Sequence, residues 1–170
     1  MRSRKVRRAA NVAAMSGWTL AFFALVTLMS VIVGDFLSIP LGVVLGVLAY
    51  NELRGGAMIR RFEPAGATRL AYNQIALGVV IVVYSVWSLI SALRSPDLAA
   101  ATASVGDPQV SAMLGSITNI VTYGLYGTMV AVGVIVPGLT AIYYQTRARL
   151  IRDVLAATPP WVIAALRAAS

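Results

Sequence analysis

The sequence contains no histidine and no cysteine, and its only lysine is Lys5. These absences remove imidazole acid–base chemistry, thiol nucleophiles, disulfides and the usual ligands of zinc and haem. A serine nucleophile needs a nearby base, and the one lysine lies in the N-terminal flank. No glycine-rich phosphate loop is present. We therefore expect a protein that is not an enzyme and that needs no cofactor or metal.

Charged residues are also scarce, because they make up 12% of the 170 residues while hydrophobic residues make up 59%. The mean hydropathy is +0.80. So few polar groups cannot cover the surface of a water-soluble domain of this size. The composition therefore predicts an integral membrane protein, and no repeat or linker divides it into separate domains.

Long runs without a charged residue indicate where the chain crosses the bilayer, since a spanning helix needs about 20 mainly apolar residues. Four such runs lie at 9–34, 36–51, 70–93 and within 108–146. The first follows a basic start but is longer than the core of a signal peptide, so we interpret it as an uncleaved span. The second is short enough to be a re-entrant or interfacial segment instead.

The net charge of +8 would suggest nucleic acid in a soluble protein, but here the basic residues flank apolar runs. If all four runs cross, thirteen of the fourteen basic residues fall on one side and only Arg94 on the other. If the second run does not cross, the basic residues divide almost evenly. The positive-inside rule therefore favours four spans with both termini cytoplasmic, and a basic surface that meets anionic lipid headgroups rather than nucleic acid.

The predicted fold class is all-α, a polytopic integral membrane protein with four transmembrane helices in a bundle, N-in and C-in. Its composition is typical of a bacterial cytoplasmic (inner) membrane protein. We place the spans at approximately 12–33, 36–53, 71–93 and 117–144, with an extracytoplasmic loop at 95–116 and a cytoplasmic amphipathic tail at 145–170.

The connections between these spans carry their own signals. Asp35 or Ser38 can cap the second helix after a tight turn, which makes the first two helices an antiparallel hairpin. The chain is expected to turn again at Gly55–Gly56 and at Pro64–Ala65–Gly66. A short surface helix is expected to begin at Ser95–Pro96 or Asp107–Pro108. From Trp161 the tail either lies in the membrane interface or frays.

No ionisable residue is expected deep in the membrane. Asp35, Glu52, Arg69 and Arg94 all fall at the ends of the predicted spans, where solvation and headgroups account for them. Small multidrug exporters use a carboxylate within the first span, and this first span has none. That difference counts against a similar mechanism.

Small and mildly polar residues on the spans are the candidates for helix packing. Gly42 and Gly46 form a G-x-x-x-G pair, whose partner is a helix of the same chain or of a second copy. One face of the third span and one of the fourth also carry small residues, and Pro137 is expected to kink the fourth as a packing feature or a gate. Asn73, Gln74 and Asn119 are the best candidates for hydrogen bonds between helices. The complete set of packing candidates is Gly42, Gly46, Gln74, Gly78, Ser85, Ser88, Asn119, Gly124, Gly127 and Pro137.

Three functions fit this pattern. The first is a non-catalytic scaffold, subunit or modulator of a membrane assembly, which associates with itself or with another membrane protein. The second is a small transporter or channel for a neutral or small solute, with a path past Gln74, Ser85, Ser88 and Asn119 that is gated near Pro137. The third is an accessory subunit of an enzyme, which the sequence does not distinguish from the first.

Overall fold

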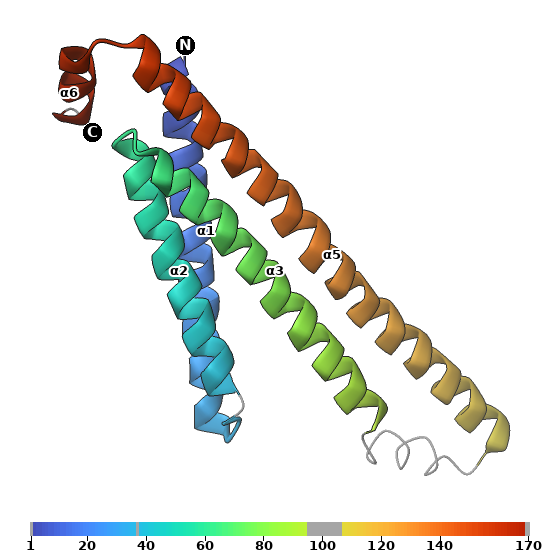
Figure 1. Ribbon diagram of the computed structural model, residues 1–170. Coiled ribbons are helices and arrows are strands. Elements are labelled where there is room, and N and C mark those ends of the chain that lie inside the picture. Colours follow the sequence, from blue (N-terminus) through green and yellow to red (C-terminus); the bar gives the residue numbers. More distant parts are fainter. Residues whose placement is uncertain (1, 37, 95–106, 169–170) are drawn as a thin grey trace. The chain divides into compact units, whose positions relative to one another are not determined.

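The protein is mainly helical in the part that the computed structural model describes, namely residues 2–36, 38–94 and 107–168 (Figure 1). Long α-helices account for most of these residues, and no strand occurs among them. The predicted all-α class is confirmed. The elements in chain order are α1 (Arg2–Met29), the short 3-10 helix η1 (Ser30–Val33), α2 (Ser38–Arg60), α3 (Pro64–Leu93), α5 (Pro108–Ala157) and α6 (Pro160–Ala168).

α1 and α2 form the expected antiparallel hairpin, joined by a tight turn. Gly34 ends η1 with a positive φ of 89°, a conformation that costs glycine little. The Ser38 hydroxyl then donates to the Asp35 carbonyl at 2.6 Å as α2 begins. A Cβ atom added to Gly42 would lie 2.6 Å from the Leu28 side chain of α1. The two helices therefore pack closely where glycine leaves room.

The turn between α2 and α3 lies later in the sequence than the turn predicted at Gly55–Gly56. α2 continues through Gly55 and Gly56, and the chain reverses at Phe62, which has a φ of 58° and a side chain only 2% exposed. A Cβ on Gly55 would lie 2.6 Å from Leu70, and one on Gly66 would lie 2.8 Å from the Gly55 carbonyl oxygen. The expected turn at Gly55–Gly56 is therefore wrong, because these glycines serve the close packing of helices instead.

α5 is longer than the predicted fourth span. It is helical from Pro108 to Ala157, so it includes the surface helix expected before the span and the start of the tail after it. The Asp107 carboxylate caps it by accepting a hydrogen bond from the backbone N–H of Gln109 at 2.8 Å. The alternative helix start at Ser95–Pro96 lies outside the described residues. At 1.5 Å per residue α5 is about 75 Å long, whereas a bilayer core is roughly 30 Å thick.

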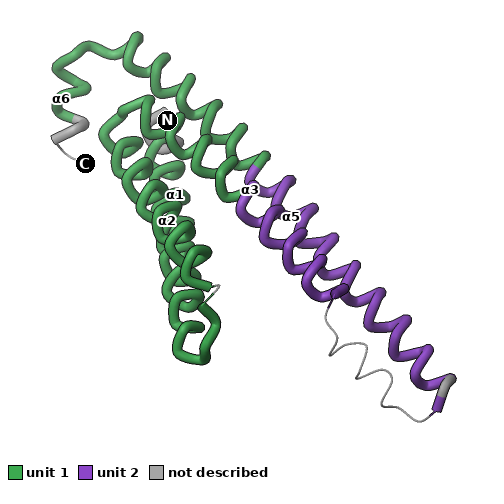
Figure 2. Tube along the Cα trace, turned by 60° about the horizontal axis from the view of Figure 1, so that its bottom comes forward, with its two compact units in different colours: residues 1–77, 138–170 green, residues 78–137 purple. Residues whose placement is uncertain are grey.

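The chain divides into two compact units, residues 1–77 with 138–170 and residues 78–137 (Figure 2). In the first unit, side chains from α1, α2, α3 and α5 form one apolar core. In the second, α3 and α5 approach closely, since a Cβ on Gly78 would lie 2.7 Å from the Gly133 carbonyl oxygen and 3.2 Å from Pro137. The core of the first unit consists of Val6, Ala9, Ala10, Ala13, Ile59, Phe62, Ala67, Leu70, Ala71, Ala141, Tyr144, Ala148 and Ile151.

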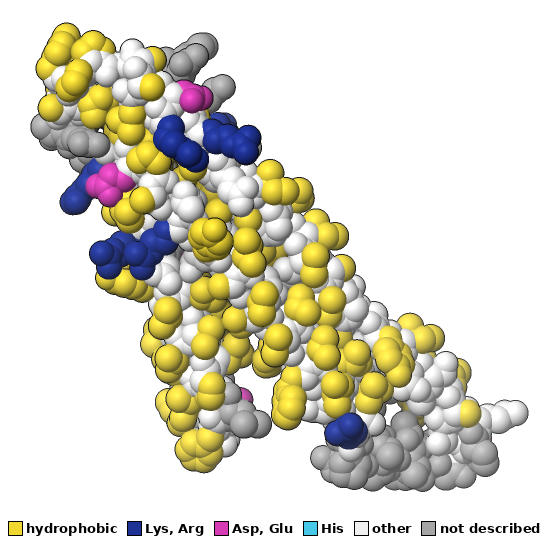
Figure 3. Space-filling view, viewed as in Figure 1, with side chains coloured by type: hydrophobic (Ala, Val, Ile, Leu, Met, Phe, Trp, Pro, Cys, Tyr) yellow, Lys and Arg dark blue, Asp and Glu magenta, His cyan; other side chains and the backbone are white. Residues whose placement is uncertain are grey.

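Three of the described helical segments are long and apolar enough to cross a membrane, by length and composition: Val6–Val33, Pro64–Leu93 and Gln109–Ala157. At most 17% of the most apolar window in each is buried within the chain. Figure 3 accordingly shows yellow apolar side chains over much of the visible surface. So much exposed apolar surface is compatible with lipid or protein around the helices, and not with water. α2 is not among the three, because its apolar stretch gives way to Asn51, Glu52 and Arg54.

Candidate functional site

Glu52 is the most unusual residue of the first unit, because its carboxylate is completely buried. The residue is 0% exposed, although it follows an apolar stretch at the point where we expected the span to end. The prediction that headgroups solvate Glu52 is therefore wrong. Leu48, Ala49, Gly55 and Gly56, three or four residues away on the same face of α2, are buried too.

Both carboxylate oxygens of Glu52 accept hydrogen bonds from α3 and α5. The Asn73 amide donates from Nδ2 to Oε2 at 2.7 Å, and the Gln74 amide donates from Nε2 to Oε1 at 3.0 Å. The Tyr144 hydroxyl donates to Oε1 at 3.3 Å. These bonds join residues far apart in sequence, so the Glu52 side chain of α2 ties α3 and α5 to its own helix.

α1 also borders Glu52, because Ser16 lies close enough to the carboxyl group to influence it. The three hydrogen-bond donors and Ser16 are all neutral. A carboxylate only accepts hydrogen bonds, and the three donors satisfy most of its capacity. Neutral donors reduce the cost of burying the carboxylate without the second desolvation cost of a buried cation.

Asn73 is the central donor of this cluster. Its Nδ2 also donates to the Leu48 carbonyl of α2 at 3.0 Å, so one amide group holds both the backbone and the Glu52 carboxylate of the neighbouring helix. Its Oδ1 is buried and has no hydrogen-bond partner among the described residues. The expectation that Asn73 and Gln74 make hydrogen bonds between helices is confirmed.

The first unit, which contains Glu52, also carries several arginines, and two of them make hydrogen bonds to a neighbouring helix. Arg60 of α2 donates to the Asn11 side chain of α1 at 3.3 Å, and Arg69 of α3 donates to the Asn51 side chain of α2. On α5 the guanidinium carbon of Arg147 lies 4.6 Å from the centre of the Tyr143 ring, a cation–π contact. Figure 3 shows dark-blue basic side chains gathered on this unit.

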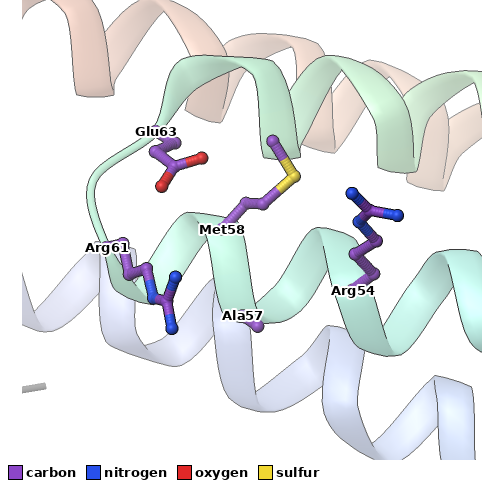
Figure 4. Close-up of a pocket in the computed structure, with 5 residues that line it drawn as sticks. All are labelled: Arg54, Ala57, Met58, Arg61 and Glu63. Carbon is purple, nitrogen blue, oxygen red and sulfur yellow. The ribbon is translucent and has the colours of Figure 1, made fainter.

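A small hollow of about 260 Å³ lies at the turn between α2 and α3 (Figure 4). Arg54, Ala57 and Met58 line it from the last two turns of α2, Arg61 lines it from the first residue after α2, and Glu63 lines it from the residue just before α3. Arg54 also donates to the Tyr50 hydroxyl at 3.3 Å. The hollow therefore offers two guanidinium groups and one carboxylate beside apolar side chains.

The packing candidates on α2 and α3 occupy different surroundings. Gly42 packs against Leu28, whereas a Cβ on Gly46 would meet no described atom within 4 Å. Gln74 belongs to the Glu52 cluster, and Gly78 packs against Gly133. The Ser85 hydroxyl is buried and donates to the Ile81 carbonyl of its own helix at 2.7 Å. Ser88 is half-buried.

The candidates on α5 lie on more than one face. Pro137 is buried against Gly78, and α5 continues through it as a helix. Asn119 is exposed, and a Cβ on Gly124 or Gly127 would meet no described atom within 4 Å. Gly133 is a small residue of α5 that packs against α3, because an added Cβ would lie 2.7 Å from the Ile81 side chain.

The site residues missed from sequence are Glu52, which was expected at a solvated span end, and Tyr144, whose hydroxyl donates to it. A detectable signal was present, because small or apolar residues three and four positions on either side of Glu52 mark a packed helix face. Among the described residues no three acidic side chains come together as a metal site would require. A scan against protein-family models, a search of curated proteins and a search of solved structures found no match to this chain.

Proposed function

We propose that this chain is a non-catalytic subunit or scaffold of a membrane assembly, and that it associates through α5 with a second copy or with another membrane protein. The observation that carries this proposal is the open face of α5 around Gly124 and Gly127. Both glycines are exposed and leave room at the helix surface. In lipid, helices associate by close packing of such small residues.

Asn119 adds polar chemistry on another part of the α5 surface, because five and eight residues separate it from Gly124 and Gly127. Its amide is exposed on a helix whose neighbouring side chains, such as Ile120 and Val121, are apolar and also exposed. An amide group in hydrocarbon gains from a hydrogen bond to a neighbouring helix. A partner helix at Asn119 would therefore meet a hydrogen-bonding group.

The topology proposed for this function is four spans in a bacterial inner membrane with both termini cytoplasmic. Two features support it. α2 is about 35 Å long at 1.5 Å per residue and runs back along α1, which is one of the three membrane-length helices. Arginines of α2, α3 and α5 also lie in the first unit, as the positive-inside rule requires of a cytoplasmic side.

The size of the protein in mild detergent tests the assembly. Native mass spectrometry and crosslinking of the full chain are expected to show a complex larger than one chain. Gly127→Leu should weaken self-association because the larger side chain fills the open face. Val132→Leu is the matched control, since Val132 is exposed elsewhere on α5. A wild-type chain that is monomeric, and that purifies from its native membrane without a partner, would contradict the proposal.

A transporter for a small solute is the second candidate, and the buried carboxylate of Glu52 favours it. Glu52 lies near the cytoplasmic end of the proposed second span, and ionisable side chains that face the interior of a membrane bundle commonly mark solute or proton pathways. The neutral path expected from sequence has less support, because Gln74 binds Glu52 and Ser85 bonds its own helix. Flux into vesicles containing the protein is the test. Transport that Glu52→Gln abolishes while the fold is retained would favour this candidate over a structural role.

A further inference from the structure

The hollow at the turn between α2 and α3 combines opposite charges in a small space. Arg54 and Arg61 are exposed, and Glu63 is half-buried. Figure 4 shows Arg54 on α2, Arg61 at the start of the turn after α2, the Met58 side chain between them, and the Glu63 carboxylate on the turn that leads into α3. Two guanidinium groups suit a phosphate, and a carboxylate suits a primary ammonium group.

An exposed apolar stripe leads to this hollow along the same face of α2. Val43, Val47 and Tyr50 are 53%, 55% and 58% exposed. The steps from Val43 through Val47, Tyr50, Arg54 and on to Arg61 are three, four or seven residues, so these side chains share one helix face. The stripe is apolar up to Tyr50 and basic from Arg54 onward.

We propose that this face of α2 binds one phospholipid whose headgroup carries both a phosphate and a primary amine. Arg54 and Arg61 bind the phosphate, and the Glu63 carboxylate binds the ammonium group. An acyl chain lies along Val43 and Val47. Tyr50, whose hydroxyl accepts a hydrogen bond from Arg54, marks the level of the membrane interface. The inference rests on the proposed membrane topology, which puts the turn between α2 and α3 at the bilayer surface.

Glu63 distinguishes this headgroup from others. A glycerol headgroup would also satisfy the arginines through its phosphate, but it offers the Glu63 carboxylate only neutral hydroxyl donors, which bind a carboxylate less strongly than an ammonium group does. A choline headgroup carries a positive charge without N–H donors, so it makes no hydrogen bond to the carboxylate. The chemistry of the hollow therefore selects a primary amine next to a phosphate.

Lipid binding to the full-length protein, stripped of native lipid in detergent, tests the proposal. Phosphatidylethanolamine, phosphatidylglycerol and phosphatidylcholine with identical acyl chains are added in equal amounts, and bound lipid is counted by native mass spectrometry. Phosphatidylethanolamine should give the most abundant complex. Glu63→Gln should remove the preference for it over phosphatidylcholine and leave binding of phosphatidylcholine unchanged. Arg54→Gln should weaken binding of all three lipids on the order of tenfold.

Arg149→Gln is the matched control, because Arg149 is an exposed arginine of the same unit that does not line the hollow. Free phosphoethanolamine at the same concentration should not displace the lipid, since it lacks the acyl chain. Equal binding of the three lipids, an equal loss in Arg149→Gln, or displacement by the free headgroup would overturn the site alone. A chain that stays dissolved without detergent would overturn the membrane assignment as well.

Discussion

At the scale of single residues, the buried Glu52 carboxylate shows how polar groups organise this otherwise apolar chain. Apolar side chains give little directional preference to helices in lipid, because the lipid tails are equally apolar. A carboxylate on α2 with donors from α3 and α5 has few equivalent arrangements. The cluster therefore specifies which faces of the helices meet.

Removing individual donors from Glu52 should lower stability in the order of their geometry. Asn73→Ala removes two hydrogen bonds, at 2.7 and 3.0 Å, and leaves a buried carboxylate oxygen without that donor, so we expect a loss of about 2 kcal/mol. Tyr144→Phe removes one bond of 3.3 Å and should cost less, about 0.5 to 1 kcal/mol. Thermal unfolding in detergent, followed by circular dichroism, measures both. A larger loss for Tyr144→Phe would contradict the geometry.

At the scale of the helices, close contacts depend on a few glycines rather than on every glycine in a small-residue pattern. Gly78 lets α3 approach the backbone of α5, since an added Cβ would lie 2.7 Å from the Gly133 carbonyl oxygen. At Gly46 an added Cβ would meet no described atom within 4 Å. The same substitution should therefore have opposite effects at these two positions.

Gly78→Ala and Gly46→Ala form a matched pair that tests the contact between α3 and α5. Gly78→Ala forces the backbones apart and should destabilise the protein by about 1 to 3 kcal/mol. Gly46→Ala should be neutral or stabilising by up to about 1 kcal/mol, because alanine is the better helix former. Unfolding temperatures of the two variants against the wild type give the comparison. Equal destabilisation would show that α2 uses Gly46 as a contact in the assembled protein.

The helices could be predicted from sequence better than the contacts between them. Long charge-free runs mark α1, α3 and α5, and the capping residues Ser38 and Asp107 lie close to observed helix starts. The turn after α2 was misplaced, because glycine at a close helix contact and glycine in a turn give the same local signal. Burial of Glu52 depends on Asn73, Gln74 and Tyr144, and sequence spacing does not show that these residues converge.

At the scale of the whole molecule, the central claim is that the chain crosses a membrane four times with α2 as the second span. α2 is the decisive helix. Among the described long helices, it is the one whose sequence is not apolar enough to make it a candidate membrane span by length and composition. If α2 crosses, Asp35 and Ala65 lie on opposite sides of the membrane. If it does not, they lie on the same side.

Cysteine labelling of intact spheroplasts tests this claim most directly, because the chain has no cysteine of its own. Asp35→Cys and Ala65→Cys each place one thiol at an exposed position on either side of α2. With a membrane-impermeant maleimide, we predict that Asp35→Cys is labelled in intact spheroplasts and Ala65→Cys only after lysis. Labelling of both variants, or of neither, before lysis would contradict the four-span account.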